Sequence, residues 1–296
     1  MSYRELFVSP SFVFIGSQKS FEESNYVILG VPLDVTSTFR TGCRFAPHAI
    51  RQASLHLETY SFRASIDAED LMIHDLGDLH VTSEVDETLN RLELVVKEIL
   101  EADKLPVLIG GEHTITLGAT KGIDENIAIV SFDAHLDMRN EYMGLTMSHT
   151  TFMRRVYEQV KPQKILEIGT RAVCKEELDF AKNPNIEFLT VQQIIEDGLK
   201  KTTQKIRNIL SDFDKIYLTI DMDVLGPAFA QAVQNPEPDG LGMHTFLDLL
   251  CEVCKHSIVA FDLVEVTPHY DAGTTAIQAA KTILEILCYI EKRRSV

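Results

Sequence analysis

Short runs rich in valine, isoleucine and leucine alternate with amphipathic stretches along almost the whole chain. Seven such runs occupy residues 25–34, 104–111, 126–133, 164–170, 186–191, 215–221 and 257–266. Their centres are continuously apolar, which is typical of strands that are buried on both faces of a parallel sheet. We therefore predict a strand in each run.

The stretches between these strands carry apolar residues at helical spacing, most clearly in Glu84–Ala102 and Thr274–Lys292. Alternation of strands and helices predicts an α/β protein, a three-layer α/β/α sandwich with a mainly parallel central sheet. A TIM barrel is the alternative, because the same units could close on themselves. The chain has no internal repeat, low-complexity tract or linker, so we expect a single domain over residues 1–296.

Charge narrows the classes of function. The 296 residues include 28 basic and 44 acidic side chains, a net charge of −16, and 45% are hydrophobic. The hydrophobic content excludes a disordered chain. The acidic balance argues against binding to nucleic acid or to an anionic membrane, both of which require a basic surface. It suits a small cationic molecule, although carboxylates that hold a metal ion would also count here as negative charge.

The five cysteines show no disulfide spacing, which suits a reducing compartment. Cys251 and Cys254 form a CxxC, but they lie within a helical pattern and no second pair exists, so we favour helix packing over a zinc or redox site. The first residues do not resemble a signal peptide, and Lys281 and Glu285 interrupt the apolar C-terminal helix. We expect a soluble, cytoplasmic protein without a membrane span.

Polar residues directly after buried strands are candidates for function, because open α/β sheets bind ligands beyond the carboxyl ends of their strands. Three of the predicted strands end in acids and histidines. Residues two apart in extended backbone point the same way, so the members of the second and third groups converge. The groups are Glu112 and His113, then Asp133, His135 and Asp137, then Asp221 and Asp223.

Each group also has a structural interpretation. An Asp-x-Asp at a strand end can cap a helix, and Gly110 and Gly111 before Glu112 could form a tight turn with unusual backbone angles. The DAHLD segment is harder to explain in that way, because Asp133 and Asp137 would repel each other without a cation between them. Three such strand ends in one chain favour a metal site.

The number and type of ligands indicate the metal. Six side chains are too many for one tetrahedral zinc, and a set rich in oxygen favours a harder, octahedral ion such as Mn²⁺. Two ions fit if two carboxylates bridge them, and four carboxylates balance two divalent charges. The six candidates are His113, Asp133, His135, Asp137, Asp221 and Asp223.

Two further residues complete the candidate site. Glu265 stands at the carboxyl end of the run 257–266, where nearly all the preceding residues are apolar. A buried carboxylate there could pair with an arginine of the chain, or it could hold a guanidinium group through two hydrogen bonds; we favour the second because of the neighbouring metal site. His149, expected at the start of a helix, is a candidate proton shuttle.

The chain resembles the ureohydrolase family, which includes arginase and agmatinase. The segments GGEH, SFDAHLD, SHTTFMRR, DMDVLGPAFA, NPEPDGL and EVTPHYD occur in the order and spacing of that family, and the resemblance extends from about Val27 to the last helix. It implies an α/β/α fold around an eight-stranded, mainly parallel sheet. It also implies two Mn²⁺ per subunit, release of urea from a guanidino compound, and a trimer or hexamer of identical subunits.

The resemblance also implies a role for each candidate residue. Glu265 would hold the guanidinium group while a metal-bridging hydroxide attacks its carbon. Asp137 would help to move the proton of the nucleophile, and His149 would contact the substrate and exchange protons with solvent. Of the metal ligands, His113 and Asp137 would hold one Mn²⁺, His135 and Asp223 the other, and Asp133 and Asp221 would bridge both.

Within the family, the segment after DAHLD is similar to agmatinase, since it lacks the pattern with which arginases bind an α-carboxylate. This implies cleavage of agmatine to putrescine and urea, a step of polyamine biosynthesis. The chain departs from the family pattern at three places. Glu112 replaces an aspartate, a change that we expect to be tolerated because this residue is not one of the metal ligands. Gly226-Pro227 replaces Asp-Pro, and the loop at 232–237 beside the substrate's tail is changed.

Those departures leave further functions open. A related ureohydrolase could act on arginine, guanidinobutyrate, guanidinopropionate or formiminoglutamate. A single-zinc amide hydrolase of the deacetylase type, which shares the fold, is a second possibility. A sensor that binds agmatine without turning it over is a third.

Overall fold

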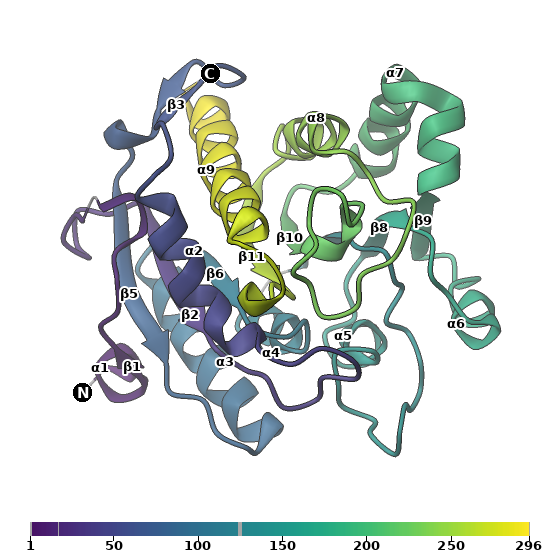
Figure 1. Ribbon diagram of the computed structural model, residues 1–296, viewed down its shortest axis with the longest axis horizontal. Coiled ribbons are helices and arrows are strands. Elements are labelled where there is room, and N and C mark those ends of the chain that lie inside the picture. The colour runs from purple at the N-terminus through teal and green to yellow at the C-terminus, as the bar shows by residue number, and fades with distance from the viewer. Residues whose placement is uncertain (1, 17, 124–125, 296) are drawn as a thin grey trace.

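The computed structural model describes residues 2–16, 18–123 and 126–295. A twisted central sheet runs through the molecule, with helices on both faces (Figure 1). Its strand order is β1-β5-β2-β6-β11-β10-β7-β8-β9, and only β1 runs antiparallel to its neighbour. The strands are β1 (Val8–Ser9), β2 (Tyr26–Val31), β5 (Ile73–Leu79), β6 (Leu105–Gly110), β7 (Ala128–Phe132), β8 (Lys164–Thr170), β9 (Ile186–Thr190), β10 (Ile216–Asp221) and β11 (Ile258–Val264).

Helices form the two outer layers. One face of the sheet is covered by α2 (Ala46–Ser54), α7 (Val191–Leu210), α8 (Met243–Val253) and α9 (Thr274–Arg294), whose apolar residues share one buried cluster. The other face is covered by α3 (Val85–Glu101), α4 (Ile115–Lys121), α5 (Phe152–Gln159) and α6 (Lys175–Phe180). The described residues also form α1 (Tyr3–Phe7), a small hairpin of β3 (Tyr60–Ser61) and β4 (Ile66–Asp67), and five short 3₁₀ helices.

The architecture confirms the predicted α/β/α sandwich with its mainly parallel sheet. All seven predicted strands are present, and the predicted helices correspond to α3 and α9. The TIM barrel alternative is wrong, because the sheet is open and ends at β1 and β9. Within the described residues, no helix is both long enough and apolar enough to cross a membrane.

Strand β5 was not predicted, because its sequence IHDLGDL does not form a continuous apolar run. Its residues alternate between buried and partly buried positions. This pattern is typical of a strand whose one face packs on the core while the other face is partly exposed to solvent. The CxxC also has a structural explanation: Cys251 lies in the last turns of α8 and Cys254 caps its end, and both are free thiols.

A buried ion-pair network joins α2 to β5. The guanidinium of Arg51, which is fully buried, donates two hydrogen bonds to Asp75, each 2.8 Å long. It also bonds Asp78 and the carbonyl oxygen of Gly77. The bidentate geometry satisfies both charged groups inside the protein. We refer to Arg51, Asp75 and Asp78 as the α2–β5 ion-pair network.

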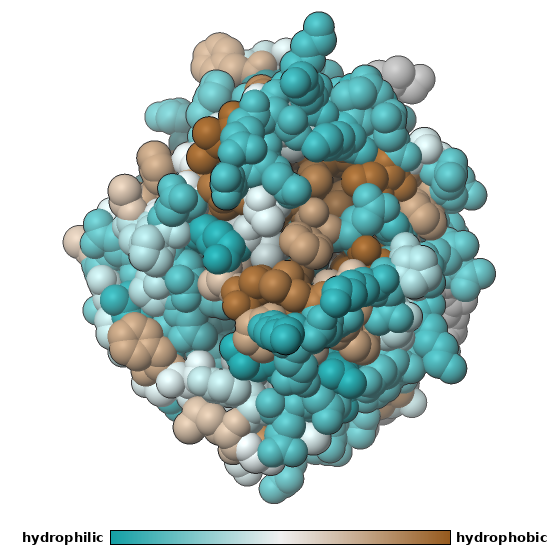
Figure 2. All heavy atoms as spheres, turned by 90° about the vertical axis from the view of Figure 1, so that its right-hand side faces the viewer, coloured by the Kyte–Doolittle hydropathy of each residue, from teal (hydrophilic) through white to brown (hydrophobic). Residues whose placement is uncertain are grey.

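Apolar side chains also gather on the face that carries α6 and α7 (Figure 2). This face includes a shallow hollow between α7 and the loop before α8, where Ile195 is 67% exposed and Leu199 is 39% exposed. This face therefore exposes apolar side chains to solvent.

Candidate metal centre and active site

The strand register brings the predicted residues together at one edge of the sheet. Strands β6, β11, β10 and β7 are neighbours, and Asp221, the last residue of β10, pairs with Val264 of β11. Phe132 of β7 pairs with the preceding residue of β10, so Asp133 emerges beside Asp221. Glu265 and the turn after β6 meet there as well, because the Glu265 amide donates to the Gly111 carbonyl over 2.9 Å.

Two groups of side chains in this region have the geometry of metal sites, and they share one residue. In each group the candidate ligand atoms lie within 4.8 Å of one another. The buried carboxylate of Asp133 belongs to both groups. Its Oδ2 lies 3.2 Å from His113 Nδ1, and its Oδ1 lies 3.5 Å from His135 Nδ1. The groups are His113, Asp133 and Asp221, and Asp133, His135 and Asp223. Asp137, the sixth predicted ligand, has Oδ2 3.7 Å from His113 Nδ1.

Backbone geometry at this edge is unusual at two functional positions. Asp137 has φ of +51° and Glu265 has φ of +69°, although neither is glycine. Left-handed backbone costs free energy for such residues and is often found at functional sites. Gly110 and Gly111 have no such angles, so the structural interpretation that gave them unusual backbone conformations is wrong. A Cβ on Gly111 would lie only 1.9 Å from the Leu33 carbonyl oxygen, so glycine permits close approach instead.

Hydrogen bonds fix which nitrogen of His113 faces the acids. The Thr219 hydroxyl donates to Asp262, so it can only accept from His113 Nε2, which lies 2.8 Å away. A neutral His113 ring therefore carries its proton on Nε2 and directs the lone pair of Nδ1 toward the carboxylates. Nδ1 is buried and has no hydrogen-bond partner within the described residues. This is the arrangement of a metal-binding histidine held by a second layer of hydrogen bonds.

The acids of the two groups and Asp137 repel one another without a cation. Burial raises the pKa of Asp137 well above its ordinary value, and the charge of Asp133 adds to the effect. Burial and the charge of Asp223 do the same for the pKa of Asp221. Burial disfavours the charged form of His113, yet the neighbouring carboxylate of Asp133 raises its pKa to about 9. A divalent ion would remove this repulsion, so the donor set fits metal binding.

Glu265 and His149 lie beside these groups. The Glu265 side chain is buried, and its Oε1 accepts a 2.6 Å hydrogen bond from the backbone amide of His113. Burial, with the charge of Asp221, raises the pKa of Glu265 well above its ordinary value. His149 Nδ1 lies 3.8 Å from the same Glu265 oxygen. His149 precedes α5 by three residues, so it lies in the turn before the helix rather than at its start.

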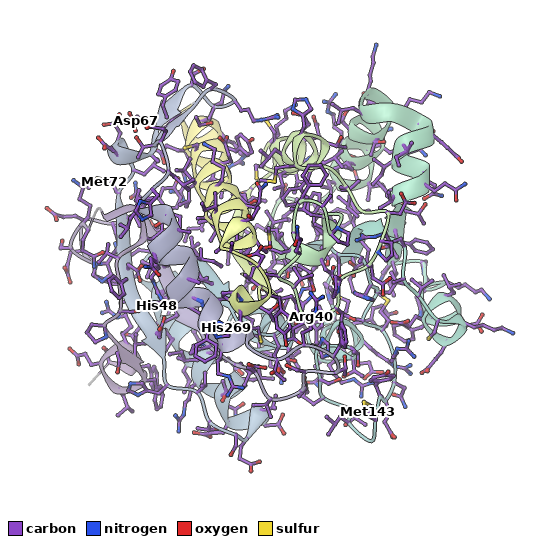
Figure 3. The ribbon with its side chains drawn as sticks, in the orientation of Figure 1. Arg40, His48, Asp67, Met72, Met143 and His269 are labelled. Carbon is purple, nitrogen blue, oxygen red and sulfur yellow. The ribbon has the colours of Figure 1, made fainter. Side chains whose placement is uncertain are left out.

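A cavity of about 530 Å³ opens onto the site. Six of the eight predicted residues line it, while His113 and Asp133 lie outside its lining. Sequence reasoning did not identify several further lining residues, including Thr38, Arg139, Tyr142 and Glu177, whereas Asn235 and Glu237 belong to the loop that was expected beside the substrate's tail. Arg40 and Met143, each one position after a lining residue, both lie in the lower half of the view in Figure 3.

Glu112 supports the cavity wall. Its carboxylate accepts hydrogen bonds from the backbone amides of Val35 and Thr36 and from the hydroxyls of Thr36 and Thr114, all 2.7–2.8 Å long. It therefore holds the loop after β2 against the turn after β6. A glutamate satisfies these donors at a position outside both candidate ligand groups, consistent with the expectation that this departure is tolerated.

Some supporting residues had a sequence signal that could have revealed them. Thr219 and Asp262 are polar residues inside otherwise apolar strands, and both orient His113. Glu167 stands in β8 in the same way. It is buried, neither carboxylate oxygen has a hydrogen-bond partner within the described part of the chain, and burial raises its pKa. A charged residue inside a buried strand is costly and usually has a specific role.

Comparison with known proteins identifies the family. Residues 24–288 match the model of the Arginase family. The agmatinase of Bacillus cereus is 35% identical over 93% of this chain and 95% of its own. The N(1)-aminopropylagmatine ureohydrolase of Thermococcus kodakarensis is 33% identical over 88% of this chain and 89% of its own. The crystal structure of the agmatine ureohydrolase of Thermoplasma volcanium superposes with a TM-score of 0.89 at 32% identity, over 99% and 98% of the two chains. The chain therefore belongs to the arginase family of hydrolases.

Proposed function

We propose that this protein is a binuclear manganese hydrolase that cleaves agmatine to putrescine and urea. The observation that carries the proposal is the pair of candidate ligand groups that share Asp133, with the buried carboxylate of Glu265 beside them. The similarity to agmatinases over nearly the whole chain supports the same substrate.

In this proposal the two ions are held by the six residues at the strand ends. An oxygen-rich set with two imidazoles favours Mn²⁺ over a single zinc. When bound, two such ions lower the pKa of water and so supply a nucleophile at neutral pH. His113 and Asp137 would hold one ion, His135 and Asp223 the other, and Asp133 and Asp221 both.

The side chains around the ions bind the substrate and move protons. Glu265 would accept hydrogen bonds from the guanidinium nitrogens, because a buried carboxylate binds that planar cation strongly. The hydrogen bond from the backbone amide of His113 holds the Glu265 carboxylate in place before the substrate arrives. Asp137 would accept the proton of the attacking water and pass it to the leaving amine, while His149 would exchange that proton with solvent through the cavity that it lines.

A longer substrate is the second candidate, and one observation favours it. The carboxylates of Glu177 and Glu237 line the cavity in addition to the proposed ligands and Glu265. Glu237 is partly exposed and its Oε1 lies 3.5 Å from His135 Nε2. These acids could receive a second amine, as in N(1)-aminopropylagmatine, the substrate in the name of the Thermococcus kodakarensis relative.

A substrate panel tests the proposal. Urea release in the presence of Mn²⁺ would be measured with agmatine, N(1)-aminopropylagmatine, arginine, guanidinobutyrate, guanidinopropionate and formiminoglutamate. We expect agmatine to give the highest kcat/KM. Preference for the aminopropyl compound, lost in Glu237→Gln, would identify the second candidate. Absence of turnover with every compound would refute the function.

Metal content distinguishes this function from that of an amide hydrolase. Two manganese ions per chain support the proposal, whereas one zinc per chain would favour an amide hydrolase of the deacetylase type. Agmatine binding by calorimetry without turnover in Mn²⁺ would indicate a sensor. We further propose one domain over residues 1–296, assembly into a trimer or hexamer, and action in the cytoplasm; light scattering of the purified protein measures the assembly.

A further inference from the structure

The changed loop at 232–237 reaches the candidate proton shuttle through one hydroxyl group. Asn235 Nδ2 lies 3.2 Å from Thr38 Oγ1, and Thr38 Oγ1 lies 3.1 Å from His149 Nε2. All three residues line the cavity. Segments that are far apart in the sequence therefore form one short chain of hydrogen bonds that ends on the imidazole.

The donors and acceptors give this chain a direction. The Asn235 amide nitrogen can only donate, so the Thr38 oxygen accepts from it. Within the described residues, the remaining neighbour at hydrogen-bond distance from the Thr38 hydroxyl is His149 Nε2. We assign the hydroxyl proton to Nε2, which then accepts it with a lone pair, because this arrangement gives the proton a partner within the protein and the reverse arrangement does not. This places the ring proton of a neutral His149 on Nδ1.

The other side of the ring favours the same tautomer. His149 Nδ1 faces Glu265 Oε1 at 3.8 Å, and this oxygen already acts as an acceptor toward the His113 amide. A proton on Nδ1 is attracted to the carboxylate, whereas a lone pair there would be repelled. Burial, with the charges of His135 and His113, lowers the pKa of His149 to about 3, so the ring is neutral and has a defined tautomer.

We propose that Asn235, acting through the Thr38 hydroxyl, is a positioning residue that holds His149 in the tautomer protonated at Nδ1. The tautomer itself follows from the hydrogen bonds, while its effect on turnover rests on the proposed function. In that function the unprotonated Nε2 would receive a proton only from the Thr38 hydroxyl. The protonated Nδ1 would direct its proton toward Glu265 and the substrate.

The neighbouring residue of the same loop holds Glu265. The backbone amide of Gln234 donates a 3.0 Å hydrogen bond to the backbone carbonyl of Glu265. The buried side-chain amide of Gln234 donates to Cys43 Sγ over 3.0 Å. Consecutive residues of the loop thus contact Glu265 and, through Thr38, His149. The loop acts on the reacting end of the site as well as on the region near the substrate's tail.

Nitrogen NMR of the whole protein tests the tautomer. Histidines would be labelled with ¹⁵N, the protein loaded with diamagnetic Mg²⁺, and the His149 signals assigned by their loss in His149→Gln. We expect a protonated Nδ1 and an unprotonated Nε2. In Asn235→Asp the introduced carboxylate accepts the Thr38 proton, so Thr38 must accept from Nε2 and the proton moves to that nitrogen. Thr38→Val should weaken the preference, with Glu265 as its remaining cause, and Thr38→Ser should retain it in full.

Kinetics test the consequence. We expect Asn235→Asp and Thr38→Val to lower kcat by at least about tenfold with little change in KM, because the shuttle is misoriented while substrate contacts persist. Thr38→Ser should remain close to wild type. Gln231→Glu, at an exposed position of the same segment, adds the same charge without reaching Thr38 and should leave both constants unchanged.

Three results would overturn the proposal. A wild-type His149 protonated at Nε2 contradicts the assigned tautomer. An unchanged tautomer in Asn235→Asp shows that Asn235 does not control it. A rise in KM alone shows that Asn235 binds substrate rather than positions the imidazole. The NMR result does not depend on turnover, so it stands even if every guanidino compound in the panel fails.

Discussion

The α2–β5 ion-pair network and the candidate metal centre both bury several charged groups, yet they differ in how those charges are satisfied. In the network, the Arg51 guanidinium bonds Asp75 twice and reaches Asp78, so the positive group lies directly among its partners. In the metal centre, acids lie beside acids and His113 Nδ1 has no hydrogen-bond partner within the described residues. Buried charges that are paired with one another within the protein stabilise the fold, whereas buried charges that are left unpaired require a ligand.

The largest expected effect would come from Asp133→Asn. The variant removes the carboxylate that both candidate groups share, so metal affinity should fall by more than the roughly 10–100-fold that an outer-shell partner contributes. Activity should be lost with the metal. Metal content after dialysis and urea release would be measured together. Asp75→Asn is the control: it should lower stability without lowering metal content, and equal metal loss in both variants would abolish the distinction between the two regions.

Arg51→Met tests the other region. The variant leaves the buried Asp75 carboxylate without its counter-charge, so the free energy of unfolding should fall by about 3–5 kcal/mol. Denaturant unfolding measures this change. Lys182→Met breaks an exposed pair with Asp179 and should change the free energy by less than about 1 kcal/mol. Similar effects in the two variants would show that the buried network is not a stabilising element.

Glu265→Gln should separate substrate binding from metal binding. The amide keeps the shape of the side chain but loses the charge-assisted bonds to a guanidinium, which contribute about 1.5–3 kcal/mol, so kcat/KM should fall by about 10–100-fold. Both metals should remain, because Glu265 belongs to neither candidate ligand group. Metal loss equal to that of Asp133→Asn would contradict this division of roles.

A smaller effect should appear in the pH dependence of stability without metal. Folding raises the pKa of Asp137 and Asp221 above 3.8 and that of His113 from 6.5 to about 9. Between about pH 4 and 9 the unfolded chain therefore binds fewer protons than the folded one, and stability falls as pH rises. The lowered pKa of Asp133 acts only below 3.8, outside this window. The lowered pKa of His149 opposes the trend below about pH 6.5, but the raised groups, which also include His135 and Glu265, outnumber it.

Thermal unfolding at pH 5 and pH 8 measures this change. The metal-free protein should be less stable at pH 8, and Mn²⁺ should raise stability most at that pH, since the ligands bind the ion in their deprotonated forms. Asp133→Asn should abolish most of the stabilisation by Mn²⁺. Greater stability of the metal-free protein at pH 8 would contradict the proposed repulsion among the acids.

Much of the sheet could be predicted because its central strands are buried on both faces. Continuous apolar runs such as 126–133 and 215–221 have few other structural interpretations in an α/β chain. Strand β5 could not be recognised in this way, because Asp75, Gly77 and Asp78 interrupt its apolar pattern. Those aspartates bind Arg51 from another element, and no local pattern records that contact.

The candidate ligands could be predicted because strand ends in a parallel sheet share an edge, so local spacing already implies a common location. The contact of Asn235 with Thr38 joins residues 197 positions apart, and it depends on the path of two loops. The close approach at Gly111 could not be predicted for a similar reason. Its need for glycine comes from the Leu33 carbonyl of another segment, not from its own backbone angle.

The left-handed backbone at Asp137 and Glu265 has a consequence for protein engineering. Each residue holds a conformation that glycine would adopt at lower free energy, with a cost on the order of 1–3 kcal/mol per position. A library screened for thermal stability alone would therefore enrich Asp137→Gly and Glu265→Gly and discard the side chains that the proposed chemistry uses. Selection at these two positions must include activity, because stability and catalysis favour different residues there.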